Sequence, residues 1–308
     1  KALGLEVPRR AEWIRVIFQE LARLHSHLIF LGTGSVDLGG IALLFYCFRA
    51  RDEVLDLFEM ACGARMHPRY CQVGGVAEDL PRGFERKARE LIAFMRDQVD
   101  QYDELIAANP IWLQRTQGVG VLSPDFAIRM GMTGPNLRAS GVPYDLRSAN
   151  GGYGAYREIG YTPATAQGGD VHARFRVRIE EMRASLDVIE KALDGIPEGP
   201  VITDDRKVAL PPRHELHTSM ESLIHHFKLV TEGFEVPAGE VYAPIESARG
   251  EFGFHLVSDG GPKPWRVRLR SPSLVLLQSL AKLCEGVYLA DLIAILASID
   301  PVLGDVDR

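Results

Sequence analysis

Long amphipathic stretches constrain the fold of this chain more than any other feature of its sequence. The clearest runs from Val171 to Leu193, where apolar residues recur every three or four positions, as on one face of a helix. Asp170 before it is a natural helix N-cap, and Gly195 after it is a natural stop. Similar spacing predicts further helices over residues 8–31, 41–58, 85–106, 214–230, 272–283 and 287–299. Because apolar helix faces are buried against one another, we expect a mainly helical bundle.

A small antiparallel sheet is predicted late in the chain. Residues 241–247, 252–259 and 265–269 alternate between apolar and polar side chains, and the first two stretches flank a turn at Arg249 and Gly250. Short strands are also possible near Gly118–Val121, inside a loop-rich stretch from Pro110 to Gly169. The predicted fold class is therefore mainly α with a small antiparallel β insertion over residues 241–270.

Composition and charge exclude several classes of protein. The 308 residues are 46% hydrophobic and 25% charged, which is typical of a globular chain with a large core. The net charge is −6 and the basic residues are scattered, so we expect no nucleic-acid partner. No apolar run approaches the roughly 18–20 residues that span a bilayer, so we expect the chain to lie outside the membrane. The first residue is Lys, and we expect the N-terminal part of the domain to be missing.

The four cysteines do not form a recognisable ligand set. Cys47, Cys62, Cys71 and Cys284 include no Cys-x-x-Cys pair, so neither a zinc ribbon nor an iron–sulfur site is predicted in this chain. The glycine-rich stretches also lack the spacing of phosphate-binding loops, and we expect no nucleotide site.

The last ten residues, 299–308, form an unusual C-terminus. They read Ile-Asp-Pro-Val-Leu-Gly-Asp-Val-Asp-Arg and follow an apolar helix directly, with three acids and a terminal Arg close together. On physical grounds alone, a capped last helix with a solvated tail remains the simpler interpretation. Seven other stretches are distinctive when taken in order; they lie at residues 65–81, 133–141, 181–185, 211–213, 246–251, 257–260 and 271–274.

Together these stretches resemble the catalytic 49 kDa (D) subunit family of respiratory complex I, the NADH:quinone oxidoreductase. That family is related to the large subunits of nickel–iron hydrogenases, whose C-terminus carries Asp-Pro-Cys-x-x-Cys as nickel ligands. Here Val302 and Asp305 occupy the two Cys positions, so the nickel thiolates are absent. The resemblance implies a hydrogenase-large-subunit-like helical bundle that covers residues 1–308 as one domain.

The resemblance also implies a function. In that family the chain is one wall of a chamber where quinone is the substrate, reduced by electrons from a 4Fe-4S cluster in the adjacent subunit and coupled to proton translocation. The implied partners are the cluster subunit, a beta-rich neighbour subunit, a ferredoxin-like subunit and a quinone-channel membrane subunit. The implied location is peripheral, on the cytoplasmic side of the bacterial inner membrane or the matrix side in an organelle.

Two residues are implied to act in catalysis. Asp37 matches the family's acid that orients a proton-donating His, and His67 matches a His beside the cluster. From the residues alone, two alternatives stay open: Asp37 caps a helix, and His67 is a structural histidine that follows Arg65.

Six other positions match the quinone chamber. Asp300, Val302 and Arg308 in the tail match chamber-lining positions, and Asp305 is either on a proton path or structural. Arg249 and Ser258 match polar positions near the cluster-facing wall. The family's two proton donors, a His and a Tyr, match no position in this sequence.

Three alternatives remain at this stage. His214, His217, Glu221 and His225 share one predicted helix and could hold a metal, although a polar helix face is the simpler interpretation. A working nickel–iron hydrogenase would need a C-terminal Cys pair that this chain lacks. A non-catalytic scaffold or divergent paralogue in a membrane-bound, hydrogenase-like electron-transfer complex is the alternative function.

Overall fold

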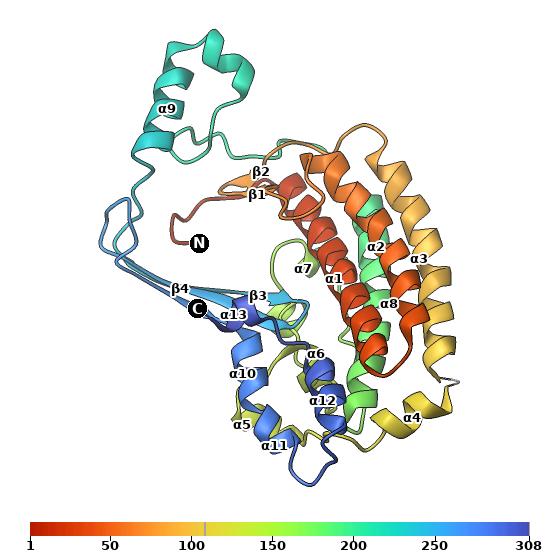
Figure 1. Cartoon of the computed structure of the whole chain (residues 1–308). Coiled ribbons are helices and arrows are strands. Elements are labelled where there is room, and N and C mark those ends of the chain that lie inside the picture. Colours follow the sequence, from red (N-terminus) through yellow and green to blue (C-terminus); the bar gives the residue numbers. More distant parts are fainter. Residues whose placement is uncertain (108, 308) are drawn as a thin grey trace.

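Four long helices form the core of the protein. The computed structural model describes residues 1–107 and 109–307. In it, α1 (Arg9–Asp37), α2 (Ile41–Cys62), α3 (Phe84–Ala107) and α8 (Val171–Gly195) pack side by side (Figure 1). The predicted mainly helical fold is confirmed.

The core helices begin and end where local chemistry favours it. Asp170 Oδ1 accepts a hydrogen bond from Ala173 N (2.7 Å) at the start of α8, as its N-cap position predicts. Gly63, with φ 73°, ends α2 in the left-handed conformation. The predicted end of the first helix, near residue 31, is wrong, because α1 continues to Asp37. The glycines in its last turns permit close packing: a Cβ on Gly34 would lie 2.9 Å from Phe175 of α8.

The predicted small sheet is also confirmed. Strands β3 (Gly239–Ser247), β4 (Gly250–Ser258) and β5 (Arg266–Arg270) form an antiparallel sheet in the order β3-β4-β5. The β3–β4 turn falls at Ala248 and Arg249, and the sheet reaches away from the bundle on the side opposite α3 (Figure 1). A second, two-stranded sheet pairs β1 (Cys71–Gln72) with β2 (Gly75–Val76).

Short helices fill the stretch between α3 and α8. They are α4 (Pro110–Thr116), α5 (Pro124–Arg129), α6 (Gly134–Arg138), η1 (Ala149–Gly151) and α7 (Tyr156–Ile159). The possible strand near Gly118–Val121 is wrong, since those residues form turns and bends.

Two further helix predictions were too long. The stretch 214–230 divides into η2 (Arg213–His217) and α9 (Met220–Thr231), because Ser219 caps a new helix by accepting a hydrogen bond from Ser222 N. The C-terminal region divides into α10 (Pro272–Gln278), α11 (Leu280–Leu283), α12 (Asp291–Ile299) and α13 (Leu303–Val306). Helix α9 projects from the body (Figure 1). Throughout the described residues, every helix is too short or too polar to cross a bilayer.

Candidate functional site

The tail is held against α1 and the β3–β4 turn by one arginine. Arg249 donates from Nη2 to Asp300 Oδ1 and from Nε to the Asp300 carbonyl, both at 3.2 Å. Its Nη1 donates to Ser26 Oγ on α1 at 3.0 Å. We call Ser26, Arg249 and Asp300 the tail cluster. The structure therefore brings together two of the residues that the sequence nominated, Arg249 and Asp300.

Asp300 is in an unusual chemical setting. It ends α12 in the left-handed conformation, with φ 52°, and its side chain is mostly buried. Burial raises the pKa of its carboxyl group above the ordinary value, although Arg249 and Arg178 oppose that rise. Its Oδ2 atom has no hydrogen-bond partner within the described part of the chain. Asp300 is thus a buried acid with one oxygen paired to Arg249 and the other without a hydrogen bond in the described part of the chain.

The next tail residues are anchored to α10. Val302 N donates to Ser273 Oγ (3.3 Å), and Asp305 Oδ2 accepts from Ser273 N (3.4 Å). Asp305 therefore holds the tail in place, while the Val302 side chain remains 37% exposed. Arg308 lies outside the described residues.

A histidine that the sequence did not nominate lies beside the tail cluster. Arg51 Nε donates to His25 Nε2 at 2.8 Å. Burial, together with the positive charges of Arg51 and Arg249, lowers the pKa of His25 to about 4. His25 is therefore a neutral imidazole at physiological pH and serves as an acceptor for Arg51.

Exposed apolar side chains continue from this polar region along α1 and α2. Val36, Ile41, Phe45 and Phe48 are 38%, 60%, 67% and 41% exposed, and we call them the apolar strip. Phe45 and Phe48 lie on the same face of α2 as Ile41, at helical spacing. A solvated surface rarely carries so much contiguous apolar area, so the strip favours a binding face.

The other nominated residues lie apart from the tail cluster. Asp37 is exposed at the end of α1, and His67 is exposed just after α2, so the length of α2 separates them by roughly 30 Å. Ser258 is at the opposite end of β4 from Arg249, where its Oγ donates to the Val236 carbonyl at 2.7 Å. The roles proposed for these three residues remain predictions.

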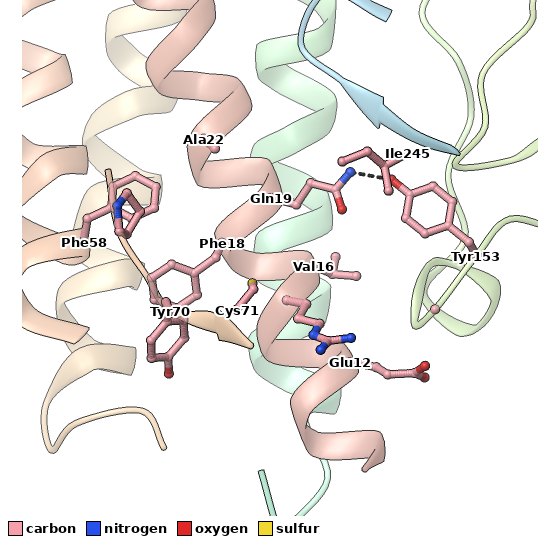
Figure 2. Close-up of a pocket in the computed structure, with 13 residues that line it drawn as sticks. Glu12, Val16, Phe18, Gln19, Ala22, Phe58, Tyr70, Cys71, Tyr153 and Ile245 are labelled. Carbon is pink, nitrogen blue, oxygen red and sulfur yellow. Dashed lines mark hydrogen bonds between the residues drawn. The ribbon is translucent and has the colours of Figure 1, made fainter. Parts of the chain in front are cut away.

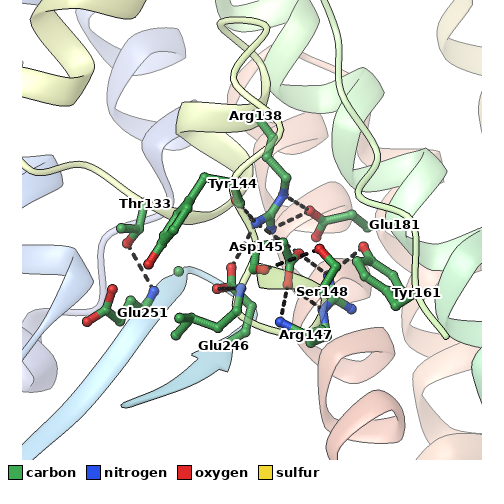
Figure 3. A network of polar contacts seen from close by, with 12 residues as sticks. Thr133, Arg138, Tyr144, Asp145, Arg147, Ser148, Tyr161, Glu181, Glu246 and Glu251 are labelled. Carbon is green, nitrogen blue, oxygen red and sulfur yellow. Dashed lines mark hydrogen bonds and ion pairs between the residues drawn. The ribbon is translucent and has the colours of Figure 1, made fainter. Parts of the chain in front are cut away.

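A buried ion network links α1, α6, α8 and β3, and Figure 3 shows the part of it around Arg138 and Arg147. Its members are Glu20, Arg23, Arg138, Asp145, Arg147, Glu181 and Glu246. At its centre Arg138, fully buried, pairs with Glu181 at 2.6 Å, Glu246 at 2.8 Å and Asp145 at 3.0 Å. Three carboxylates thus converge on one guanidinium.

The network joins α1 to the β3–β4 hairpin. Arg147 pairs with both Asp145 (2.7 Å) and Glu20 (3.1 Å), and Glu20 pairs in turn with Arg23 (3.1 Å). Arg23 also donates to the carbonyls of Glu246 (2.7 Å) and Ser247 (2.9 Å), directly before the turn that carries Arg249. The hairpin that carries Arg249 is therefore hydrogen-bonded to α1 through the buried network.

Ion pairing outweighs burial for most of the network's acids. Burial alone would raise the pKa of Glu20, yet Arg23 and Arg147 lower it to about 2. Burial would also raise the pKa of Glu181, but Arg138 lowers it well below its ordinary value. Glu246 is the exception, because burial and the neighbouring Asp145 raise its pKa despite Arg138. The buried His27, whose Nε2 bonds Glu181 at 2.8 Å, has a pKa lowered by burial to about 4.

Sequence reasoning missed this network, although a signal was present. Glu20, Arg23 and His27 follow helical spacing and fall among the apolar positions of α1 that face the core. Charged residues inside an apolar stripe are rarely buried unless they are paired. The partners lie on α6, α8, β3 and an intervening loop, which a pattern within one helix cannot reveal.

A cavity of about 550 Å³ lies against the N-terminal half of α1 (Figure 2). Val16, Gln19, Tyr70, Tyr153 and Ile245 are among its lining residues. The Tyr153 hydroxyl and the Gln19 amide are hydrogen-bonded at its wall. Among the nominated residues that the structure describes, none lines this cavity.

The histidine group near α9 does not form a metal site within the described residues. His214 and His217 lie in η2, whereas Glu221 and His225 lie in α9, so the single helix face assumed for them is divided. The exposed face of α9 is also apolar, with Met220, Phe227 and Val230 at 72%, 64% and 64% exposure. The expected polar face is therefore mixed, since exposed Glu221 lies among these apolar side chains.

Comparison with known proteins places this chain in a family. The family profile described as "Respiratory-chain NADH dehydrogenase, 49 Kd subunit" matches residues 37–308. The chain is 52% identical over 308 residues to the D subunit of NADH-quinone oxidoreductase of Deinococcus radiodurans, covering 100% of this chain and 77% of that protein. It is 51% identical over 308 residues to NADH-quinone oxidoreductase subunit 4 of Thermus thermophilus, covering 100% and 75%. It is 49% identical over 311 residues to the D 2 subunit of NADH-quinone oxidoreductase of Chloroflexus aurantiacus, again covering 100% and 75%.

The protein is thus a subunit of an oxidoreductase. The chain belongs to the family of the 49 kDa subunit of respiratory-chain NADH dehydrogenase. The resemblance inferred from eight ordered stretches is confirmed, and the alternative of a non-catalytic scaffold is not favoured.

Proposed function

We propose that this subunit forms one wall of the chamber in which its complex reduces quinone. The relatives bear the name NADH-quinone oxidoreductase, which identifies quinone as their substrate class. The observation that carries the proposal is the arrangement of the tail cluster and the apolar strip. A polar region at Ser26 is followed, within about 15 Å along α1, by exposed apolar side chains that begin at Val36.

This arrangement suits a quinone. Its headgroup carries two carbonyl oxygens that need hydrogen-bond donors during reduction, and its chain needs an apolar surface. Asp300, paired with Arg249, places an acid at the polar end, and its Oδ2 lacks a hydrogen-bond partner in the described part of the chain. Val302 and the apolar strip supply the apolar wall. Arg249 uses Nε, Nη1 and Nη2 to hold Ser26 and Asp300, so its role is to position the tail.

Reduction of a quinone to a quinol takes two electrons and two protons. We propose that the electrons come from a 4Fe-4S cluster held by the adjacent subunit and that Asp37 orients an imidazole proton donor. His67 would lie beside that cluster, where its charge state influences electron transfer. Asp305, which anchors the tail to α10, would contribute to the shape of the chamber wall, and Ser258 would lie outside it, at the far end of β4.

The remaining partners follow from the same proposal. They are a beta-rich neighbour subunit, a ferredoxin-like subunit and a quinone-channel membrane subunit, with proton translocation coupled to quinone reduction. The subunit would be peripheral, on the cytoplasmic side of the bacterial membrane or the matrix side in an organelle.

Replacing Arg249 tests the proposal. In membranes that contain the assembled complex, Arg249→Met should lower quinone reduction by NADH roughly 10–100-fold, because the tail loses its positioning contacts. Reduction of ferricyanide by NADH, which reports the upstream electron path, should be unchanged. Arg82→Met removes an exposed arginine elsewhere and serves as the control. Unchanged quinone reduction in Arg249→Met would contradict the proposed chamber.

A further inference from the structure

One face of the three-stranded sheet is apolar and uncovered. The strand register places eight apolar side chains on it: Val241, Ala243, Ile245, Phe252, Phe254, Leu256, Val267 and Leu269. None of the eight is buried, and Ile245, Phe254 and Val267 are 45%, 45% and 47% exposed. A sheet is ordinarily stabilised by burying one such face, so this one is incomplete in the isolated chain.

Strand β5 is an open edge of this sheet and is strongly basic. In the order β3-β4-β5 it has a strand partner on one side, and Arg266 and Arg268 alternate along it with Val267 and Leu269. Arg270, the last residue of the strand, is already engaged, since it donates to the carbonyls of Glu251 and Gly131. Within residues 1–107 and 109–307, the side chains of Arg266, Arg268 and the nearby Lys263 make no hydrogen bond or ion pair.

This basic edge contrasts with the whole chain, whose net charge is −6. Charged residues often protect a solvated edge strand from unwanted pairing. Here, however, the residues next to the arginines are large and apolar: Trp265 is 76% exposed and Val267 47% exposed. A purely protective edge would not expose them to water, so the combination favours an edge that is paired in the assembled enzyme.

We propose that β5 pairs with an extended segment of another subunit of the same complex, one in which acidic and apolar residues alternate. Directly opposite side chains on neighbouring strands share a face, so acids would lie across from Arg266 and Arg268. Apolar side chains would lie across from Val267 and Leu269 and extend the uncovered apolar face. Backbone hydrogen bonds would supply affinity, and the charge pattern would supply specificity and register. The proposal rests on membership of a multi-subunit oxidoreductase and is independent of where quinone binds.

Photo-crosslinking in the intact complex identifies what lies against β5. Val267 is replaced by p-benzoylphenylalanine, and Ile128, 56% exposed on α5, receives the same replacement as a matched control. The expected result is a cross-link from position 267 to one subunit, at a segment of alternating acidic and apolar residues, that is absent from position 128. A cross-link to a second copy of this chain, to lipid alone or to no partner would overturn the proposal.

Charge reversal then tests the pairing itself. Arg266→Glu combined with Arg268→Glu should lower the fraction of this subunit that stays in the complex at physiological salt by roughly tenfold. Arg82→Glu combined with Lys191→Glu makes the same charge change at two exposed positions without ion pairs in the described part of the chain, and it should have no such effect. Changing the cross-linked acids of the partner to lysine should restore retention of the reversed β5. If the charge-reversed subunit is fully retained in the complex without the lysine changes in the partner, the proposal is contradicted. If the variant fails to fold, the cross-link from position 267 remains the test of the pairing.

Discussion

Removal of Arg138 from the buried ion network should be severely destabilising. Its guanidinium is fully buried and lies within 3.0 Å of oxygens on Asp145, Glu181 and Glu246. In Arg138→Met the three carboxyl groups stay buried without their shared cation. Breaking a buried ion pair by removing one partner costs about 3–5 kcal/mol, since it leaves an uncompensated charge. Because unfolding entropy scales with chain length, this cost corresponds to a fall of about 5–8 °C in the unfolding temperature of the 308-residue chain.

Thermal unfolding of parent and variant at several pH values provides the assay. Asp145 keeps its pair with Arg147 in the variant, but Glu181 and Glu246 lose their arginine partner. The folded pKa values of these two acids should therefore rise, so protonation should relieve part of the cost as pH falls. The difference between variant and parent should therefore shrink between pH 7 and pH 5. Arg86→Met, which breaks an exposed pair with Glu90, should shift the unfolding temperature by about 1.5 °C or less. A shift in Arg138→Met as small as that control, or one that does not depend on pH, would refute this account of the network.

Three further predictions concern His27, Gly134 and Asp37. The folded pKa of His27, about 4, lies below its unfolded value of about 6.5. The free energy of unfolding should therefore fall by up to about 3 kcal/mol as pH drops between those values, and equilibrium unfolding of His27→Gln should lack this pH dependence. In Gly134→Ala a Cβ would lie 2.5 Å from the Arg249 carbonyl, so quinone reduction should fall, whereas Gly131→Ala, at a similar φ with open space around it, should lose stability alone. Asp37→Asn should lower quinone reduction while ferricyanide reduction and assembly persist; equal activity in parent and variant would remove Asp37 from proton delivery.

Features within single helices and hairpins could be predicted from sequence. The apolar spacing and the Asp170 cap located α8, and alternation around Arg249 located the β3–β4 turn. The prediction stopped the first helix at residue 31, too early, because Gly32 and Gly34 continue α1 and allow α2 and α8 to pack closely against it. Close packing between helices leaves no trace in the spacing of one helix.

The candidate site was predictable only in part. The tail and Arg249 were nominated by resemblance, and the structure brings Arg249 to Asp300. His25 accepts a hydrogen bond from Arg51 on the next helix. Arg23 donates to a carbonyl of β3, which lies more than two hundred residues further along the chain. Such contacts arise from tertiary packing, so composition and periodicity could not reveal them.

The most direct test of the central claim is to locate quinone on this subunit. A photoactivatable quinone analogue, added to the assembled complex and chased with excess natural quinone, is mapped by peptide mass spectrometry. The proposed chamber predicts specific labelling of peptides that contain Phe45 or Val302, at the apolar strip and the tail. Labelling confined to the peptides of the 550 Å³ cavity, such as those with Tyr70 or Tyr153, or absent from this subunit, would contradict it.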